Sequence, residues 1–247
     1  IMSLKRKNVL ITGSSRGIGK AIALAFAAEG CNIILNASVS SDELLKTQDE
    51  LKELGCYSYA CLTDVSDYER CKEMFNTIYS IYGNIDILVN NAGIAHLGLF
   101  SDMTPDDWNK IIDVNFKSVL NCTHLAIPKM VSRKSGNIIN ISSIWGERGA
   151  SCEAVYSATK GAINSFTKAM AKELGPSGIR VNAISCGVID TQMNMCFNEE
   201  ERAVLTDEIS LMRFGQPEEI GKIAVFLAKE DSSFVTGQII TADGCMV

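Results

Sequence analysis

Short apolar runs alternate with amphipathic stretches along nearly the whole chain. The apolar runs are bounded by glycine or polar residues, which predicts buried strands at residues 8–12, 32–36, 57–62, 85–89, 137–141, 179–184 and 238–241. The amphipathic stretches carry apolar residues at helical spacing, and several end at glycine. They predict helices at residues 17–29, 41–54, 67–82, 106–130, 158–174, 198–210 and 217–228.

This alternation predicts an α/β fold, because parallel strands need crossover helices that cover the faces of the sheet. Right-handed crossovers then give a Rossmann-type, doubly wound parallel sheet flanked by helices on both faces. The sequence shows no internal repeat, low-complexity tract or interdomain linker. A single domain over residues 1–247 is the expected organisation.

The composition limits the classes of partner. The chain has 247 residues, 47% hydrophobic and 21% charged, with a formal net charge of -6. A negative chain is a poor match for nucleic acid or an anionic membrane surface, and no apolar run is long enough to span a membrane. The nine cysteines include no C-x-x-C pair, and the two histidines form no cluster of zinc-binding spacing. We expect reduced thiols, no metal site and a cytoplasmic protein.

Three glycines follow the first predicted strand, in the sequence Gly13-Ser-Ser-Arg-Gly-Ile-Gly19. Glycines permit a tight turn into the first helix, whose free N–H groups can bind a pyrophosphate. This predicts dinucleotide binding; the alternative is a purely structural turn. Arg16 adds a positive charge, and no acid stands near Ser38, where it would bind a ribose 2′-hydroxyl. The pattern favours NADP, with NADPH preferred over NADH, unless Arg16 is an ordinary surface arginine.

A second group of residues indicates proton chemistry. Ser143 follows the strand predicted at 137–141, and Tyr156 and Lys160 are four residues apart, on one face of a helix. A phenol has a pKa near ~10, and a neighbouring ammonium lowers it toward the range in which proton transfer at neutral pH is efficient. The set suits proton exchange at a carbonyl or alcohol oxygen. The alternative is three surface residues on an ordinary helix.

Several motifs stand in order along the chain: Thr12-Gly-Ser-Ser-Arg-Gly-Ile-Gly19, Asn90-Asn-Ala-Gly93, Asn115, Ser143, Tyr156-Ser-Ala-Thr-Lys160, Arg213-Phe-Gly-Gln-Pro-Glu-Glu219 and Thr236-Gly237. Together they resemble the short-chain dehydrogenase/reductase family over essentially the whole length, most closely its 3-oxoacyl-[acyl-carrier-protein] reductases. The resemblance implies an NADPH-dependent enzyme that reduces a ketone to a secondary alcohol. The expected substrate is a 3-oxoacyl thioester of fatty acid biosynthesis, with an acyl carrier protein as a candidate partner.

The resemblance also implies a role for each site residue. Tyr156 would be the acid in reduction, Ser143 would orient the substrate oxygen, Lys160 would bind the nicotinamide ribose and lower the Tyr156 pKa, and Asn115 would hold a water for proton resupply. The implied cofactor contacts are Gly13, Ser14, Ser15, Arg16, Gly17, Ile18, Gly19, Ser38, Asp64, Val65, Asn91, Ala92, Gly93, Tyr156, Lys160, Ile189 and Thr191. Simpler interpretations exist for three of them: Asp64 as a helix N-cap, Asn115 as a buried amide and Asn91 as a turn residue.

Residues 191–215 are expected to form a substrate lid. This segment contains five large apolar residues: Met193, Met195, Phe197, Met212 and Phe214. Their side chains could form an adaptable cover over an apolar substrate, or they could belong to the core. The acidic run from Glu199 to Glu201 should face water. The chain departs from the family pattern at two positions. Cys186 stands where the family usually has proline, and Ser177 stands where the carrier-protein reductases often have a basic residue. The remaining candidate contacts for an acidic carrier are Arg133, Lys134, Lys168 and Lys172.

Other functions stay open at this point. The same motifs occur in family members that act on another small ketone, a sugar or a steroid alcohol. A catalytically silent dinucleotide-binding protein would keep the fold without the complete reaction set. Sugar-nucleotide epimerases also use a Tyr-x-x-x-Lys pair but are longer chains with a separate substrate lobe. The resemblance further implies a homotetramer, built on the predicted helix at 106–130 and the helix that carries Tyr156.

Overall fold

The computed structural model describes residues 4–39, 41–194 and 197–246, and it contains one seven-stranded parallel sheet in the order β3-β2-β1-β4-β5-β6-β7. The strands are β1 (Asn8–Ile11), β2 (Asn32–Ala37), β3 (Ser58–Leu62), β4 (Ile87–Asn90), β5 (Gly136–Ser143), β6 (Ile179–Cys186) and β7 (Ile239–Ala242). The chain builds outward from β1 to β3, then returns to β4 and builds outward to β7. This reversal between β1 and β4 opens a crevice at the carboxyl ends of the strands, where such sheets bind ligands.

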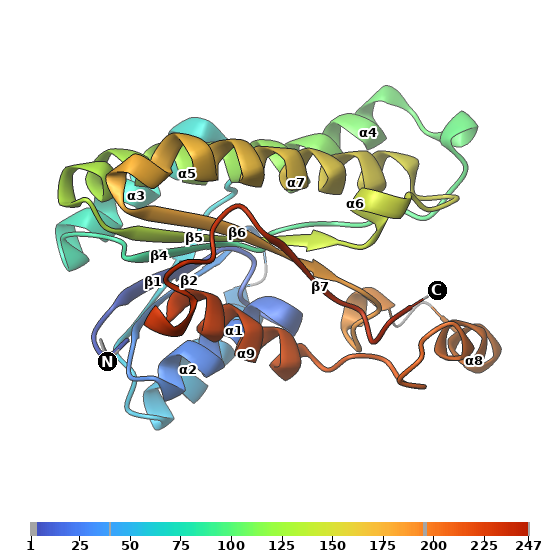
Figure 1. Cartoon of the computed structure of the whole chain (residues 1–247), viewed down its shortest axis with the longest axis horizontal. Helices are drawn as coiled ribbons and strands as arrows, with labels where there is room; N and C mark the ends of the chain where they lie inside the picture. The colour runs from blue at the N-terminus through green and yellow to red at the C-terminus, as the bar shows by residue number, and fades with distance from the viewer. Residues whose placement is uncertain (1–3, 40, 195–196, 247) are drawn as a thin grey trace.

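Helices cover both faces of the sheet (Figure 1). One face carries α1 (Gly17–Ala28), α2 (Ser41–Glu53) and α9 (Pro217–Ala228), and the other carries α3 (Tyr68–Tyr82), α4 (Pro105–Ile112), α5 (Ser118–Arg133) and α7 (Ala154–Leu174). Val9 and Ile11 join the core on the α1 face, whereas Leu10 joins the core on the α3 face. Successive residues of a strand point to opposite faces, so a sheet covered on both sides needs continuous apolar runs. The predicted doubly wound α/β fold is confirmed.

Shorter elements complete the chain. Two further α-helices, α6 (Trp145–Arg148) and α8 (Glu199–Asp207), lie near the carboxyl ends of the strands, as Figure 1 shows. Single 3₁₀ turns occur at η1 (Phe100–Asp102), η3 (Gly175–Ser177), η4 (Gln192–Asn194) and η5 (Glu230–Ser232). None of the helices in the described ranges is both long and apolar enough to cross a membrane.

The helix predicted at residues 106–130 is present, but it is not a uniform α-helix. The structure divides it into α4, a π-helical turn η2 (Asp113–Lys117) and α5, which continues past Pro128 to Arg133. A π turn inserts one extra residue into a helix and rotates the side chains around it. Here the rotated residue is Asn115, whose fully buried amide bonds to the backbone of Ile94. The apolar periodicity continues through the turn, which is why the sequence pattern does not reveal it.

Candidate active site

The glycine loop between β1 and α1 packs tightly against the end of β4. Gly13 and Gly17 adopt φ angles of 61° and 56°, which disfavour residues with a Cβ. A Cβ on Gly13 would lie 2.9 Å from the Cα of Ala92, and one on Gly19 would collide with the Gly13 carbonyl oxygen. The loop therefore needs glycine both for its backbone conformation and for its close approach to the next strand.

Asn91 and Thr12 hold this loop in place. The Asn91 amide donates to the carbonyl oxygens of Thr12 and Gly13 at 2.9 and 2.8 Å. In return, the Thr12 hydroxyl accepts from the backbone N–H groups of Asn91 and Ala92 at 2.9 and 3.0 Å. The side chain of Asn91 thus faces the loop. Thr12 is not among the predicted site residues, although its position between the strand and the first glycine is a signal for such a role.

The start of α1 has the donor set that a pyrophosphate requires. Arg16 occupies the N-cap position, but its side chain makes no capping hydrogen bond, and the first turn contains no acid. The N–H groups of Gly17, Ile18 and Gly19 therefore lie at the positive end of the helix without a side-chain cap, an arrangement that binds anions. The loop fits the dinucleotide that the sequence predicts.

The two loop serines are largely committed to the protein. Ser14 is buried, and its hydroxyl donates to Ile11 and accepts from the Asn36 N–H, both at 2.9 Å. The carbonyl oxygen of Ser15 accepts from the Thr47 hydroxyl at 2.9 Å. These bonds tie the loop to β2 and α2, so the Ser14 side chain contributes to the shape of the loop.

Arg16 and Ser38 lie exposed at the ends of the loop and of β2. The Arg16 guanidinium is paired with Glu43 in the first turn of α2, with a nitrogen–oxygen distance of 3.1 Å. The acid nearest to Arg16 is thus Glu43 in α2 and not a residue beside Ser38, so the sequence pattern around Ser38 does not reveal it. A pairing between two helices depends on how they pack, which sequence spacing alone does not show.

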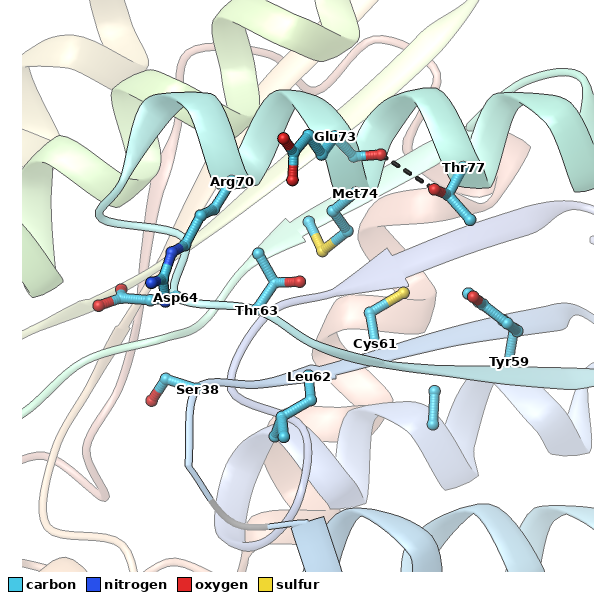
Figure 2. A pocket seen from close by; sticks show the side chains of 11 residues that line it. Ser38, Tyr59, Cys61, Leu62, Thr63, Asp64, Arg70, Glu73, Met74 and Thr77 are labelled. Atoms are coloured by element: carbon cyan, nitrogen blue, oxygen red, sulfur yellow. Dashed lines mark hydrogen bonds between the residues drawn. The ribbon is translucent and has the colours of Figure 1, made fainter.

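A pocket of about 540 Å³ follows the open edge strand β3 and the facing side of α3. In Figure 2, Ser38, Thr63 and Asp64 line one end, and Arg70 reaches from α3 toward Asp64. This end is where the resemblance places the adenine. One Asp64 oxygen accepts from the N–H and the hydroxyl of Ser66, at 3.0 and 2.7 Å.

The N-cap of α3 is Asp67, which accepts from the Arg70 N–H at 3.1 Å. The simpler interpretation of Asp64 as that N-cap is therefore not what the structure shows. Its neighbour Val65 is buried, and its carbonyl oxygen accepts from the Asn121 amide at 3.0 Å. Asn121 in α5 thus positions the backbone at this end of the pocket.

Ser143, Tyr156 and Lys160 meet at the carboxyl end of β5. Ser143 is the last residue of β5 and pairs with Cys186 at the end of β6. Tyr156 and Lys160 lie on successive turns of α7, which begins at Ala154, four residues before the predicted start. The Tyr156 phenol hydrogen-bonds to Ser143, and the Lys160 ammonium lies 5.5 Å from the centre of the phenol ring. The structure brings the three predicted residues together.

Burial controls the proton affinities of this group. It raises the pKa of Tyr156, and the hydrogen bond from Ser143 only partly opposes the rise. It lowers the pKa of Lys160 to about 8 and raises that of the neighbouring Cys186 to about 12. The sequence predicts a Tyr156 pKa lowered by Lys160. In this structure the ammonium instead donates to the Ile141 carbonyl oxygen at 3.0 Å, and desolvation of the phenol dominates.

Asn115 and Lys160 converge beside Gly93. A Cβ on Gly93 would lie 3.4 Å from the Asn115 amide oxygen and 3.7 Å from the Lys160 ammonium. The Asn115 amide accepts from the Ile94 N–H at 2.8 Å and donates to the Ile94 carbonyl oxygen at 2.9 Å. Asn115 is therefore a satisfied buried amide that fixes the segment after β4. The amide oxygen can accept a second hydrogen bond.

Ile189 and Thr191 lie across the crevice from the glycine loop. Ile189 is buried and forms a parallel bridge with Gly215. A Cβ on Gly17 would meet the Thr191 methyl carbon at 3.6 Å, so the Thr191 side chain faces the start of α1. The two walls of the predicted cofactor site are thus close together at this point.

The predicted lid region is anchored at both ends. Ion pairs join Arg202 to Asp190 at 3.0 Å and Arg213 to Glu219 at 2.8 Å. Within this region Met193 and Met212 are exposed, Phe197 is half-buried and Phe214 is buried in a core cluster. Met195 lies outside the described residues. The three acids from Glu199 to Glu201 are exposed, as predicted.

Two other expectations concern a metal ion and an acyl carrier protein. The described residues contain no group of three or more side chains with the arrangement of a metal site. The candidate carrier contacts at the end of α5, Arg133 and Lys134, lie next to the start of β5, whereas Ser143 ends that strand. In one copy of the chain they are therefore remote from the reaction centre.

Comparison with known proteins agrees with this geometry. Residues 13–246 match a family model described as enoyl-(acyl carrier protein) reductase. The chain is 40% identical over 246 residues to the 3-oxoacyl-[acyl-carrier-protein] reductase FabG of Thermotoga maritima, covering 100% of both chains. A Brucella melitensis 3-oxoacyl-[acyl-carrier protein] reductase with bound NAD superimposes with a TM-score of 0.91 at 36% identity, covering 99% of this chain and 92% of that one.

A third similar structure belongs to a protein described with a different activity. A putative gluconate dehydrogenase of Agrobacterium tumefaciens superimposes with a TM-score of 0.95 at 35% identity, covering 98% of this chain and 96% of that one. The fold, the glycine loop and the Ser143, Tyr156 and Lys160 cluster therefore coincide with full-length sequence similarity. The chain belongs to the short-chain dehydrogenase/reductase family of NAD(P)-binding oxidoreductases.

Proposed function

We propose that the protein is an NADPH-dependent reductase that converts a 3-oxoacyl thioester into the 3-hydroxyacyl thioester. The observation that carries this proposal is the hydrogen-bonded pair of Ser143 and Tyr156 beside the buried Lys160. The full-length similarity to the Thermotoga maritima reductase supports the thioester as substrate. NADPH would supply the hydride, and the residues of this chain would orient the ketone and provide the proton.

The phenol of Tyr156 suits the role of a general acid. Its raised pKa keeps the proton on the phenol at neutral pH, where the proton can pass to a carbonyl oxygen as negative charge develops. The Ser143 hydroxyl lies beside the phenol and can donate to the same substrate oxygen. The positive charge of Lys160 would stabilise the phenolate that remains after transfer.

Proton return would run on the side of Gly93. Asn115 and Lys160 face the same point there, and no side chain of residue 93 separates them. We assign Asn115 the role of holding a water that passes protons to Lys160. The alternative, a purely structural amide, predicts that its loss lowers stability without changing the pH dependence of turnover.

The preference for NADPH would come from Arg16. A guanidinium can bind a 2′-phosphate through two parallel hydrogen bonds, whereas the strand end at Ser38 offers no carboxylate to a 2′-hydroxyl. The Arg16 side chain stays 56% exposed although it is paired with Glu43, so a dinucleotide in the crevice can reach it. The adenine would occupy the pocket end at Asp64.

A charge near the reaction centre favours a neutral substrate. Glu153 lies one turn before Tyr156 at the N-cap of α7, and its charge raises the Tyr156 pKa. Burial raises the pKa of Glu153 itself. A sugar acid would bring a second carboxylate to this half-buried group, whereas a thioester brings none. This argues for the thioester over a substrate such as gluconate.

The test is a substrate panel. NADPH oxidation should be measured with acetoacetyl thioesters of coenzyme A and of acyl carrier protein, with simple ketones, and with the keto forms of sugar acids. The thioesters should give the highest kcat/KM. Faster turnover of a sugar acid would overturn the thioester assignment, while a lack of turnover with every compound would support a silent dinucleotide-binding protein.

We also propose a homotetramer. Ile112 in α4 and Val131 in α5 are exposed apolar residues. The side chain of Phe234 is fully exposed. It lies shortly before β7, the edge strand of the sheet. Exposed apolar side chains in two separate parts of the chain suit an assembly with two kinds of interface. A monomer mass by light scattering at micromolar concentration would contradict this.

A further inference from the structure

An ion pair stands at the position where the cofactor's 2′-phosphate should bind. Nη1 of the Arg16 guanidinium donates to both oxygens of Glu43, at 3.1 and 3.4 Å. Both groups remain accessible, with side-chain exposures of 56% for Arg16 and 35% for Glu43. The other basic residue of α1 near α2, Lys20, is paired with Glu50 at 2.7 Å and lies four residues further along the helix. Arg16 is thus the guanidinium at the mouth of the loop, and Glu43 already occupies it.

We propose that Glu43 competes with the 2′-phosphate of NADPH for Arg16 and so sets how strongly the protein distinguishes NADPH from NADH. This inference rests on the proposed use of NADPH. A carboxylate and a phosphate present similar oxygen pairs to a guanidinium and use the same N–H donors. Glu43 accepts from Nη1 only, and Nη1 must leave Glu43 before the guanidinium can bind the phosphate through two parallel hydrogen bonds. NADH lacks that phosphate and leaves the ion pair intact.

Glu43 is well placed to hold its position. It lies with Asp42 in the first turn of α2, where the positive end of the helix stabilises an ionised carboxylate. The neighbouring Thr47 ties the same helix to the loop through the carbonyl oxygen of Ser15. The competitor is therefore fixed on a rigid element. An acid that only stabilised the N-terminal end of α2 would not need to pair with Arg16.

The effect has a bounded size. Exposed ion pairs contribute little, so release of Arg16 should strengthen NADPH binding by about two- to five-fold. Phosphate wins the competition because it carries nearly two negative charges and the carboxylate carries one. The protein should therefore still prefer NADPH, but less strongly than the same site without Glu43.

The test measures binding and needs no substrate. Kd values for NADPH and NADH can be obtained from the fluorescence of the reduced nicotinamide. Glu43→Gln should lower the Kd for NADPH about two- to five-fold and leave the Kd for NADH unchanged. The matched control is Glu50→Gln, which removes the same charge from α2 and breaks the Lys20 pair. This control should leave the Kd for NADPH and the Kd for NADH unchanged.

An Arg16→Ala background separates competition from simple repulsion. With no guanidinium to release, Glu43→Gln should then give less than half of the gain seen in the intact protein. An equal gain in both backgrounds, or no change in the NADPH to NADH ratio in the intact protein, would overturn the inference while leaving dinucleotide binding in place. Failure of the unaltered protein to bind either dinucleotide would instead defeat the proposed function, and this inference with it.

Discussion

The ammonium of Lys160 donates a hydrogen bond to the carbonyl oxygen of Ile141, 3.0 Å away. Ile141 lies two residues before Ser143 on β5, so this bond ties α7 to the strand that carries the serine. Lys160 is only 4% exposed, and burial lowers its pKa to about 8. The fold therefore holds a cation where solvation no longer favours it, and both activity and stability should depend on pH in a defined way.

Reductase activity should fall as pH rises through about 8, because Lys160 then loses the charge that stabilises the Tyr156 phenolate. The measurement is kcat/KM with saturating NADPH from neutral to alkaline pH. Lys160→Arg provides the comparison, since a guanidinium stays charged in this range. Any activity that this variant retains should lose the alkaline limb. A wild-type profile that stays flat across pH 8 would contradict the assignment.

The same group should destabilise the fold at neutral pH. The pKa of Lys160 is about 8 in the folded chain, against ~10.4 for an unfolded lysine. The unfolded chain binds more protons between these values, so stability should rise with pH through that window, and the full penalty applies below it. Lys160→Met should raise the free energy of unfolding at pH 7 by on the order of 1 kcal/mol. Urea unfolding at neutral and alkaline pH checks this; a less stable variant at both would oppose it.

Tyr156→Phe should remove turnover and leave dinucleotide binding nearly intact. The substitution deletes the hydroxyl that would protonate the ketone and keeps the ring, so kcat should fall by about 10²–10⁴-fold. Tyr79→Phe is the matched control. It removes a hydroxyl that donates to the Leu125 carbonyl oxygen at 3.0 Å, away from the site, and should cost about 1 kcal/mol of stability without affecting turnover. Substantial residual turnover in Tyr156→Phe would exclude the acid role.

Two glycines separate backbone strain from close packing. Gly13 and Gly55 both have positive φ angles, 61° and 73°, but only Gly13 has neighbours in the path of a Cβ. Gly55→Ala should cost about 1 kcal/mol of stability, the price of the left-handed backbone, and should leave dinucleotide affinity unchanged. Gly13→Ala should cost clearly more, about 2–3 kcal/mol, and should weaken NADPH binding, because the loop must move away from Ala92. Equal losses of stability would show that the contact with Ala92 is relieved cheaply.

The parts of the molecule that depend on linear spacing could be predicted from the sequence. The sheet and its covering helices follow from apolar periodicity, and Tyr156 and Lys160 share a helical face because they are four residues apart. The position of the glycine loop follows from the strand before it and the helix after it. Each of these features is local, or is set by the alternation of strands and helices.

Features that depend on how distant segments pack could not be predicted from the sequence. The π turn leaves no break in the apolar pattern, and the Asn115 amide within it bonds to the backbone of Ile94, 21 residues earlier. The Arg16–Glu43 pair joins the start of α1 to α2, and its partners are 27 positions apart in the sequence. The raised pKa of Tyr156 comes from burial, which exists only after folding. Spacing rules do not contain this information.

The lid, residues 191–215, should determine which acyl chain lengths the protein prefers. Met193 is 49% exposed and Phe197 is half-buried, and both lie in the segment that follows Thr191, which faces the glycine loop. Their apolar side chains can pack on an acyl chain without demanding one shape. The reaction centre, in contrast, stands on β5 and α7. The chemical step on a short substrate should therefore be insensitive to the lid.

We expect the double substitution Met193→Ala and Phe197→Ala to raise KM for long 3-oxoacyl thioesters by roughly tenfold, a loss of about 1–2 kcal/mol of apolar contact. KM and kcat for the acetoacetyl thioester should change little, because its acyl chain is too short to meet the lid. Val204→Ala is the matched control, since it trims a 61% exposed side chain of α8 in the same region and should affect neither substrate. Equal effects on long and short substrates would mean that another surface selects the chain length. The rigid wall formed by β6 and Ile189 would then be the next candidate.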